Sequence, residues 1–334
     1  MTNTINAIDY RIVLSIPGEM IRRSRLMFHP DLRGSGGIDP KNLKRSYPAH
    51  CRKLPVEWLR EAEKEEPFMG NVIMVSYRNL IQNARCVAFT RHLGLCESAD
   101  EHASRSMRPF RGISFLRNGT IRADVYWPGR GMADDVEQFG GGIPVLWDGL
   151  VLTLDEMITE VCDFAHLWSL QINTTGESPV KEASLFERLQ RVFEEVRHAD
   201  ALEARDRLLE EVRALSRSGS PLLREKRYLH TLLGSRQDGG PVAGVAHGSL
   251  EEIGEIARRA GAVSAVVVDN GGSSWIGQRR GPNAELRTLV ESYYHRPPAV
   301  AVAIFELKGE PSTTFFQATG LLEERPTHAL PPAE

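Results

Sequence analysis

The chain has 334 residues, of which 41% are hydrophobic and 25% are charged, and its formal net charge is -3. This balance is typical of a soluble globular protein with one large core or two modest ones, and it excludes a disordered chain. Such a charge gives no overall positive field, so neither nucleic acid nor an anionic membrane is expected as a partner.

The start of the chain, MTNTINAIDYRIVLSIPGEM, lacks the basic and long apolar segments of a secretory signal, and no window has the length of a transmembrane helix. We therefore expect a cytoplasmic protein. The four cysteines show neither CxxC spacing nor a histidine at metal-finger distance; they are Cys51, Cys86, Cys96 and Cys162. This pattern predicts reduced thiols, without a disulfide framework or a zinc site.

The first block, residues 1–152, has the texture of strands and loops. Short β-branched or aromatic runs such as YRIVLSI, NVIMVSY and IPVLWDGLVLT are separated by Gly, Pro and Asn. The clearest hairpin signal is FLRNGTIRADVYW, in which Asn118-Gly119 stands between two alternating runs.

The second block, residues 153–221, has a helical pattern. Between residues 184 and 215 the apolar residues recur at alternating steps of four and three, with charged residues between them. This spacing predicts a helical insertion. It fits a helical hairpin packed on the domain, and it also fits a coiled-coil arm through which two copies could form a homo-oligomer.

The third block, residues 222–325, returns to strands and contains one helix, SLEEIGEIARRAG. The helix is expected to start at a Ser249 cap with Glu252 as its partner and to stop at Gly261. The buried run that follows ends on Asp269 and continues as NGGSS. This stretch fits a simple turn, and it equally fits a carboxylate delivered to a cleft beside a glycine loop and two hydroxyls.

The string GPVAGVAHGSLEEIGEIARRAGAVSAVVVDNGGSSWIG is similar to the C-terminal signature of the phosphodiester glycosidase family. Its matching positions are Gly248, Leu250, Glu252, Ile256, Ala257, Gly261, Ala265, Asp269, Gly271, Gly272, Ser273 and Ser274. The islands QFGGGIPVLWDGLVL, HTLLGSRQDG and HRPPAVAVAIFEL resemble further family segments, so the resemblance covers about residues 110–152 and 222–308. It implies an α+β fold, a phosphodiester-glycosidase-like mixed sheet domain with an inserted helical hairpin.

The resemblance implies a hydrolase that cleaves a glycosyl- or nucleoside-phosphate bond in a phosphodiester of an intracellular metabolite. Such a reaction passes through an oxocarbenium-like transition state, which the carboxylate of Asp269 could stabilise. His230 is a candidate acid or base because imidazole titrates near neutral pH, and a structural role for it stays open. The candidates for binding a phosphorylated small-molecule substrate are Gly141, Gly142, Thr231, Gly271, Gly272, Ser273, Ser274 and Arg78.

The sequence also departs from the family pattern. The early Asn-Gly-Gly-[Phe/Tyr] loop is absent, and the corresponding place after NVIMV reads Ser76-Tyr77-Arg78-Asn79. His230 replaces the family arginine, and Asn270 replaces the first loop glycine. Two alternatives therefore stay open: a non-catalytic sugar-phosphate or nucleotide-binding protein, and a biosynthetic tailoring enzyme with the same pocket. No cofactor is evident and no metal ligands are predicted, although a divalent cation stays open.

Overall fold

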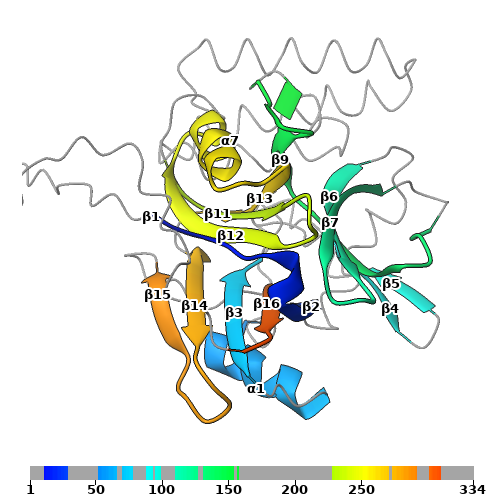
Figure 1. The fold of residues 1–334 in the computed structure, drawn as a ribbon, viewed down its shortest axis with the longest axis vertical. Helices are drawn as coiled ribbons and strands as arrows, with labels where there is room; N and C mark the ends of the chain where they lie inside the picture. The colour runs from blue at the N-terminus through cyan, green and yellow to red at the C-terminus, as the bar shows by residue number, and fades with distance from the viewer. Residues whose placement is uncertain are drawn as a thin grey trace, which may run out of the picture.

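The computed structural model describes residues 11–28, 52–65, 70–77, 88–92, 95–98, 110–126, 131–153, 156–157, 228–270, 273–291 and 301–309. Within these ranges the strands form three sheets, A, B and C (Figure 1). All the strand pairs described in them are antiparallel.

The three sheets combine strands from distant parts of the chain. Sheet A has the order β1 (Arg11–Ser15), β12 (Pro241–Gly248), β11 (Tyr228–Ser235), β13 (Ser264–Asn270), β9 (Ile143–Trp147) and β10 (Leu150–Val151). Sheet B has the order β15 (Arg287–Glu291), β14 (Trp275–Arg279), β3 (Asn71–Ser76), β16 (Ala301–Leu307) and β2 (Ile21–Phe28). Sheet C has the order β5 (Leu95–Ser98), β4 (Ala88–His92), β8 (Val136–Gly141), β6 (Phe110–Leu116) and β7 (Ile121–Tyr126).

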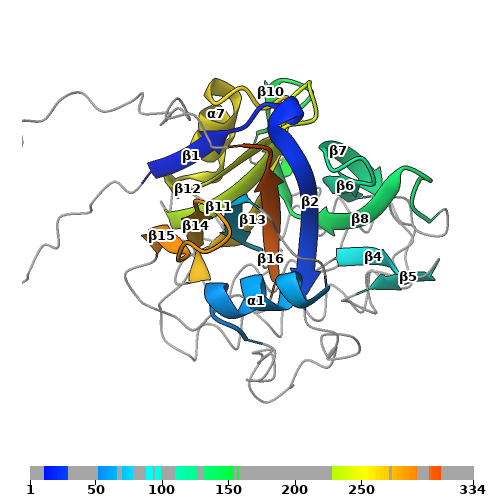
Figure 2. The ribbon, with the colours of Figure 1, turned by 60° about the horizontal axis from the view of Figure 1, so that its bottom comes forward.

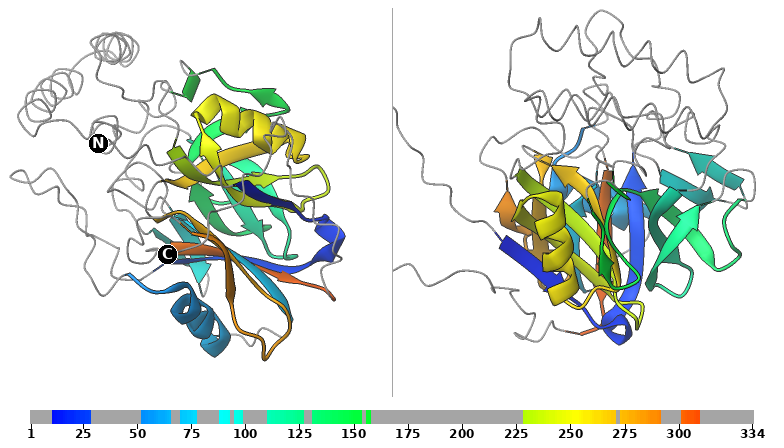
Figure 3. Two further views of the ribbon diagram at one scale, coloured as in Figure 1. Left: turned by 90° about the vertical axis from the view of Figure 1, so that its left-hand side faces the viewer. Right: turned by 90° about the horizontal axis from the view of Figure 1, so that it is seen from above.

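The described helices cover the outer faces of sheets A and B. Helix α7 (Leu250–Arg259) packs on sheet A, helix α1 (Pro55–Glu65) packs on sheet B, and the short 3-10 turn η1 (Gly18–Met20) joins β1 to β2. Sheets A and B face each other across a shared apolar core, so the layers run α7, sheet A, sheet B, α1 (Figures 1 and 3). Sheet C lies beside them, as Figure 2 shows most clearly.

The continuous apolar runs of the central strands follow from this layering. In β3, Val72 and Met74 pack against α1, whereas Ile73 and Val75 pack into the core between sheets A and B. All six residues of β3 are buried. A strand that is covered on both faces cannot alternate apolar with polar side chains, because either kind of position meets a core.

The expectation of an α+β domain with a mixed sheet was wrong. The described part of the chain is mostly antiparallel β-sheet, with α1 and α7 as its α-helices. Strands β12 and β13, on either side of α7 in the sequence, are separated in sheet A by β11, which pairs antiparallel with both. The predicted helical insertion at residues 153–221 lies, apart from residues 153 and 156–157, outside the described residues.

Two local predictions are confirmed. Strands β6 and β7 form the expected hairpin, with Gly119 at φ 93° and the side chain of Asn118 accepting a hydrogen bond from the Thr120 amide. Helix α7 begins with the complete capping box of Ser249 and Glu252. Both features are determined by residues within a few positions of each other, which makes them readable from the sequence.

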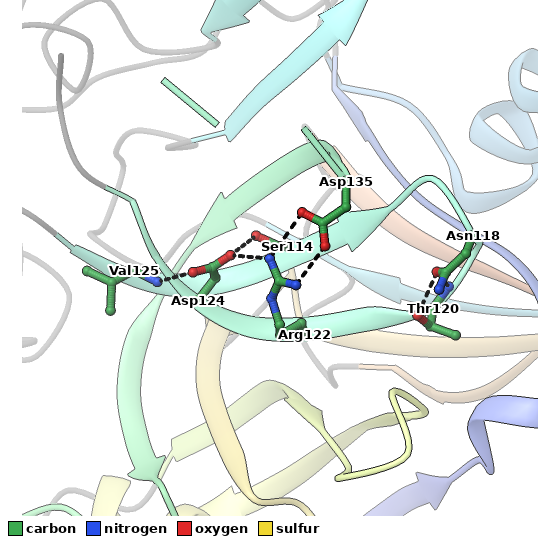
Figure 4. A network of polar contacts seen from close by, with 7 residues as sticks. All are labelled: Ser114, Asn118, Thr120, Arg122, Asp124, Val125 and Asp135. Carbon is green, nitrogen blue, oxygen red and sulfur yellow. Dashed lines mark hydrogen bonds and ion pairs between the residues drawn. The ribbon is translucent and has the colours of Figure 1, made fainter. Parts of the chain in front are cut away.

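Polar side chains fasten sheet C internally. Figure 4 shows Arg122 between two carboxylates, with Nη1 2.7 Å from Oδ2 of Asp135 and Nη2 3.1 Å from Oδ2 of Asp124. Ser114 donates to Asp124 from the neighbouring strand. The hydrogen bond from Arg122 lowers the pKa of the Asp135 carboxyl. The side chains of Arg122 and Asp135 are about half exposed, so their ion pair adds little to the stability of the sheet.

A glutamine side chain joins sheet C to sheet B. Oε1 of Gln138 accepts from the Leu26 amide at 2.7 Å, and Nε2 donates to the Leu26 carbonyl at 2.6 Å. The amide of Gln138 thus takes the place that a neighbouring backbone would take along β2, the edge strand of sheet B.

Helix α7 approaches β9 so closely that only glycine fits at position 254. A Cβ on Gly254 would lie 2.4 Å from the Val145 carbonyl oxygen. We expect Gly254→Ala to lower the free energy of unfolding by about 1–3 kcal/mol, despite the better helix propensity of alanine. Urea denaturation measures this loss. Glu251→Ala, at an exposed position of the same helix, should change stability by less than about 1 kcal/mol, and equal effects of the two variants would contradict the close packing.

Candidate functional site

The candidate site lies where the ends of strands from sheets A and B meet. Strand β13 ends at Asn270, β11 begins at Tyr228, β3 ends at Ser76, and β14 begins at Trp275. A hydrogen bond between the Ser76 and Thr231 side chains joins the two sheets at this edge, and the Trp275 amide of β14 donates to Ser76 within sheet B. The site is therefore built from segments that are far apart in the sequence, on strands rather than on loops alone.

A β-bulge in β13 aims the side chain of Asp269. Leu232 pairs with Val267 and Thr231 pairs with Asp269, so Val268 is an extra residue without a counterpart in β11. In a regular pairing of the same residues, alternation from Val267 through Val268 would place Asp269 on the face that α7 covers. Because directly opposite residues share a face, the bulge brings Asp269 to the side of Thr231, which faces sheet B.

Hydroxyl groups surround this face. The Thr231 and Ser76 hydroxyls are 2.8 Å apart, and Oγ of Ser76 accepts a hydrogen bond from the Trp275 amide at 3.2 Å. Ser273 donates to Oδ1 of Asp269 at 2.7 Å. The carboxylate is fully buried, and each of these partners has an exposed fraction of 6% or less. The described donor to this carboxylate is a neutral hydroxyl, and it acts in a low-dielectric environment.

The end of the β13–β14 connection is held at three successive residues. Ser273 binds the side chain of Asp269, the Ser274 hydroxyl donates to the Leu229 carbonyl at 3.4 Å, and the Trp275 amide donates to Ser76. The two serine hydroxyls thus use their hydrogens within the protein. They were expected to be donors to phosphate, and here both donate to oxygens of the protein.

The structure separates His230 from Asp269. His230 precedes Thr231 and lies opposite Ala246, which packs in the core under α7, so its side chain occupies the other face of sheet A. Burial lowers the pKa of this imidazole to about 4, and the neighbouring His247 acts in the same direction. A hydrogen bond with the Gly248 backbone opposes the shift. The imidazole is therefore neutral at pH 7, and the structural role left open by the sequence fits this position.

Side chains of the protein itself pack against the predicted binding residues Gly141 and Gly142 and against Gly140. The Tyr77 hydroxyl donates to the Gly141 carbonyl at 2.7 Å, and a Cβ on Gly140 would lie 2.2 Å from the same hydroxyl oxygen. A Cβ on Gly142 would come within 2.8 Å of Cβ of Val266. These glycines allow sheet C and the β8–β9 connection to approach Tyr77 and β13.

Some predicted site residues lie outside the described residues, namely Arg78, Gly271 and Gly272. The structure adds Ser76, which sequence reasoning did not assign. Its only sequence signal is that it follows the apolar run NVIMV.

Among the side chains that the structure describes, no group of three or more His, Cys, Asp or Glu residues is placed to hold a metal ion. None of the helices in the described ranges combines the length and apolar character needed to cross a membrane.

Comparisons with known proteins give distant structural similarity alone. No family model and no curated protein matches the sequence. The catalytic domain of zebrafish N-acetylglucosamine-1-phosphodiester alpha-N-acetylglucosaminidase, auto-inhibited by its pro-peptide, superposes with a TM-score of 0.43 at 11% identity, covering 90% of this chain and 88% of that one. A hypothetical protein from Synechocystis gives a TM-score of 0.35 at 9% identity, covering 89% of this chain and 62% of that one. Structural similarity at this level does not indicate a function for this chain.

The buried imidazole of His230 should make stability depend on pH. Its folded-state pKa of about 4 lies below the ordinary 6.5, so on acidification the unfolded chain takes up the proton first. The contribution of the neutral His230 to the free energy of unfolding is therefore fully present above pH 6.5. Roughly 3 kcal/mol of it is lost as the pH falls from 6.5 to 4. In His230→Gln this component is lost. Urea denaturation across this range should give a shallower decline for the variant than for the wild type, and parallel curves would contradict the assignment.

The contact between Ser76 and Thr231 should couple sheets A and B energetically. Ser76→Ala and Thr231→Val each leave a buried hydroxyl without this partner, at a cost of about 1–3 kcal/mol. The double variant leaves no orphaned hydroxyl, so its loss should fall short of the sum by about 1 kcal/mol. Chemical denaturation of the four proteins in the cycle measures this coupling, and strictly additive losses would show that the two hydroxyls act independently.

Proposed function

We propose that the protein is a hydrolase that cleaves the glycosyl–phosphate bond of a phosphodiester, with Asp269 as the charge-stabilising carboxylate. The observation that carries the proposal is the bulge in β13, which turns this carboxylate away from the α7 core and into the hydroxyl cluster. A residue needed only to end a strand would not require a buried carboxylate between two sheets.

The reaction fits a site built around one carboxylate. Water adds to the anomeric carbon, the bond from that carbon to the phosphate oxygen breaks, and a phosphate monoester leaves and takes up the proton that the water loses. The developing positive charge on the sugar is stabilised by the Asp269 carboxylate. Ordinary glycosides also need an acid to protonate an alkoxide leaving group, whereas a phosphate group leaves as a stable anion. A partner acid such as His230, on the other face of sheet A, is then not required.

Binding of a sugar phosphate or nucleotide without catalysis is the second candidate. It is supported by the hydrogen bonds of Ser273 and Ser274 within the protein, because residues held in this way suit a preformed ligand site as well as a reaction centre. A tailoring reaction in the same pocket would share the carboxylate. Turnover and binding measurements on one substrate panel separate these alternatives.

Asp269→Asn should abolish most of the activity. Asparagine keeps the shape and can still accept the Ser273 hydrogen bond, but it removes the charge, so we expect a loss of roughly 10²–10³-fold in kcat with the fold retained. The assay follows sugar release from nucleoside diphosphate sugars and from methyl diesters of sugar 1-phosphates by mass spectrometry, and circular dichroism checks the fold.

The matched control is Asp135→Asn, at an exposed carboxylate of sheet C, which should keep wild-type activity. Full activity of Asp269→Asn would reject the catalytic assignment. Saturable calorimetric binding of the panel to the wild type without turnover would favour the binding-protein alternative.

A further inference from the structure

The hydrogen bond between Ser273 and Asp269 has a geometry that can control the ionisation of the carboxylate. The two oxygens are 2.7 Å apart, Asp269 is fully buried, and Ser273 has an exposed fraction of 5%. A hydroxyl that donates to a carboxylate favours its ionised form, and this effect is large where water is excluded. Burial alone would favour the protonated form.

We propose that Ser273 is a positioning residue that keeps the Asp269 carboxylate ionised and fixed in one orientation, and that it does not read the phosphate of a ligand. The catalytic consequence rests on the proposed function, whereas the effect on the carboxylate itself does not.

The hydrogen-bond inventory supports this assignment. A serine hydroxyl has one hydrogen, and that of Ser273 is donated to Asp269. Phosphate oxygens need donors, so the same hydroxyl would have to give up the carboxylate to hold a phosphate. The backbone on both sides of the contact is also fixed, because Asp269 is paired with Thr231 and the amide of Trp275 is bound to Ser76. Ser273 is therefore held in place to act on Asp269.

The described elements that pack near Asp269 carry the following polar and charged groups. From the described chain, β11 contributes the Thr231 hydroxyl to the face of Asp269, and β3 contributes the Ser76 hydroxyl. The imidazole of His230 occupies the opposite face, and by register His247 of β12 occupies the same face as Asp269. Arg279, at the far end of β14, is paired with Glu63 of α1.

The test measures the titration of Asp269 directly. In protein labelled with ¹³C at the aspartate carboxyl, the Asp269 resonance is assigned by its absence in Asp269→Asn and followed against pH. We expect Ser273→Ala to raise the midpoint by about one pH unit. Ser273→Thr, which keeps a hydroxyl, should stay near the wild type, and Ser274→Ala serves as the matched control with an unchanged midpoint.

Two further variants test whether the hydroxyl of Ser273 causes the shift of the midpoint. Ser273→Cys keeps the volume but has a weaker donor, so it should raise the midpoint in the same direction even if the alanine variant does not fold. Repeating the comparison in a His247→Gln background should give the same rise, which excludes the imidazole as its source. An unchanged midpoint in both Ser273→Ala and Ser273→Cys would overturn the proposal.

Kinetics on the same glycosyl phosphodiesters add an independent readout. In Ser273→Ala the acid limb of the kcat/KM profile should move to higher pH with the midpoint of Asp269, while KM changes little. A rise of KM, or weaker binding confined to phosphorylated ligands, would show that Ser273 reads the phosphate and would overturn the proposal. Full activity of Asp269→Asn would reject the proposed function while leaving the titration result intact, so the two failures are distinguishable.

Discussion

The extra residue in β13 is the constraint on which the candidate site depends. A regular strand would continue the alternation of Ala265 and Val267 and direct Asp269 into the core under α7. A carboxylate among aliphatic side chains there would cost several kcal/mol or lose its charge. The bulge at Val268 instead pairs Asp269 with Thr231, on the face where the hydroxyls from sheet B are within reach. The irregular pairing at Val268 thus separates a position in the α7 core from a position on the face of Thr231.

The chemical character of the neighbours determines what this carboxylate can do. A buried Asp that is paired with Arg or Lys has its charge neutralised locally, which reduces its ability to stabilise a second positive charge. Hydroxyls solvate a carboxylate while leaving its net charge in place. The described donor to Asp269, the hydroxyl of Ser273, is of this second kind. Such a contact leaves the carboxylate able to stabilise a cationic transition state.

The sequence predicted those features that depend on residues near one another in the chain. The hairpin at Asn118-Gly119 and the cap of α7 are of this kind. Asp269, Ser273 and Thr231 were grouped through the family resemblance, and they lie close together in the structure. The sheet order could not be predicted, because it depends on β11 entering between β12 and β13. The bulge and the separation of His230 from Asp269 follow from that same long-range pairing, which local periodicity does not encode.

Glycines show why a motif needs its packing before it can be given a function. In the sequence, Gly140 to Gly142 have the appearance of a ligand loop, because bare backbone permits close approach. In the structure the approaching atoms belong to Tyr77 and Val266. The same contact ties the end of β3 to sheet C, and β3 carries Ser76 on the adjacent residue. These glycines therefore support the site indirectly, by letting Tyr77 fix the strand end from which Ser76 reaches Thr231 across the two sheets.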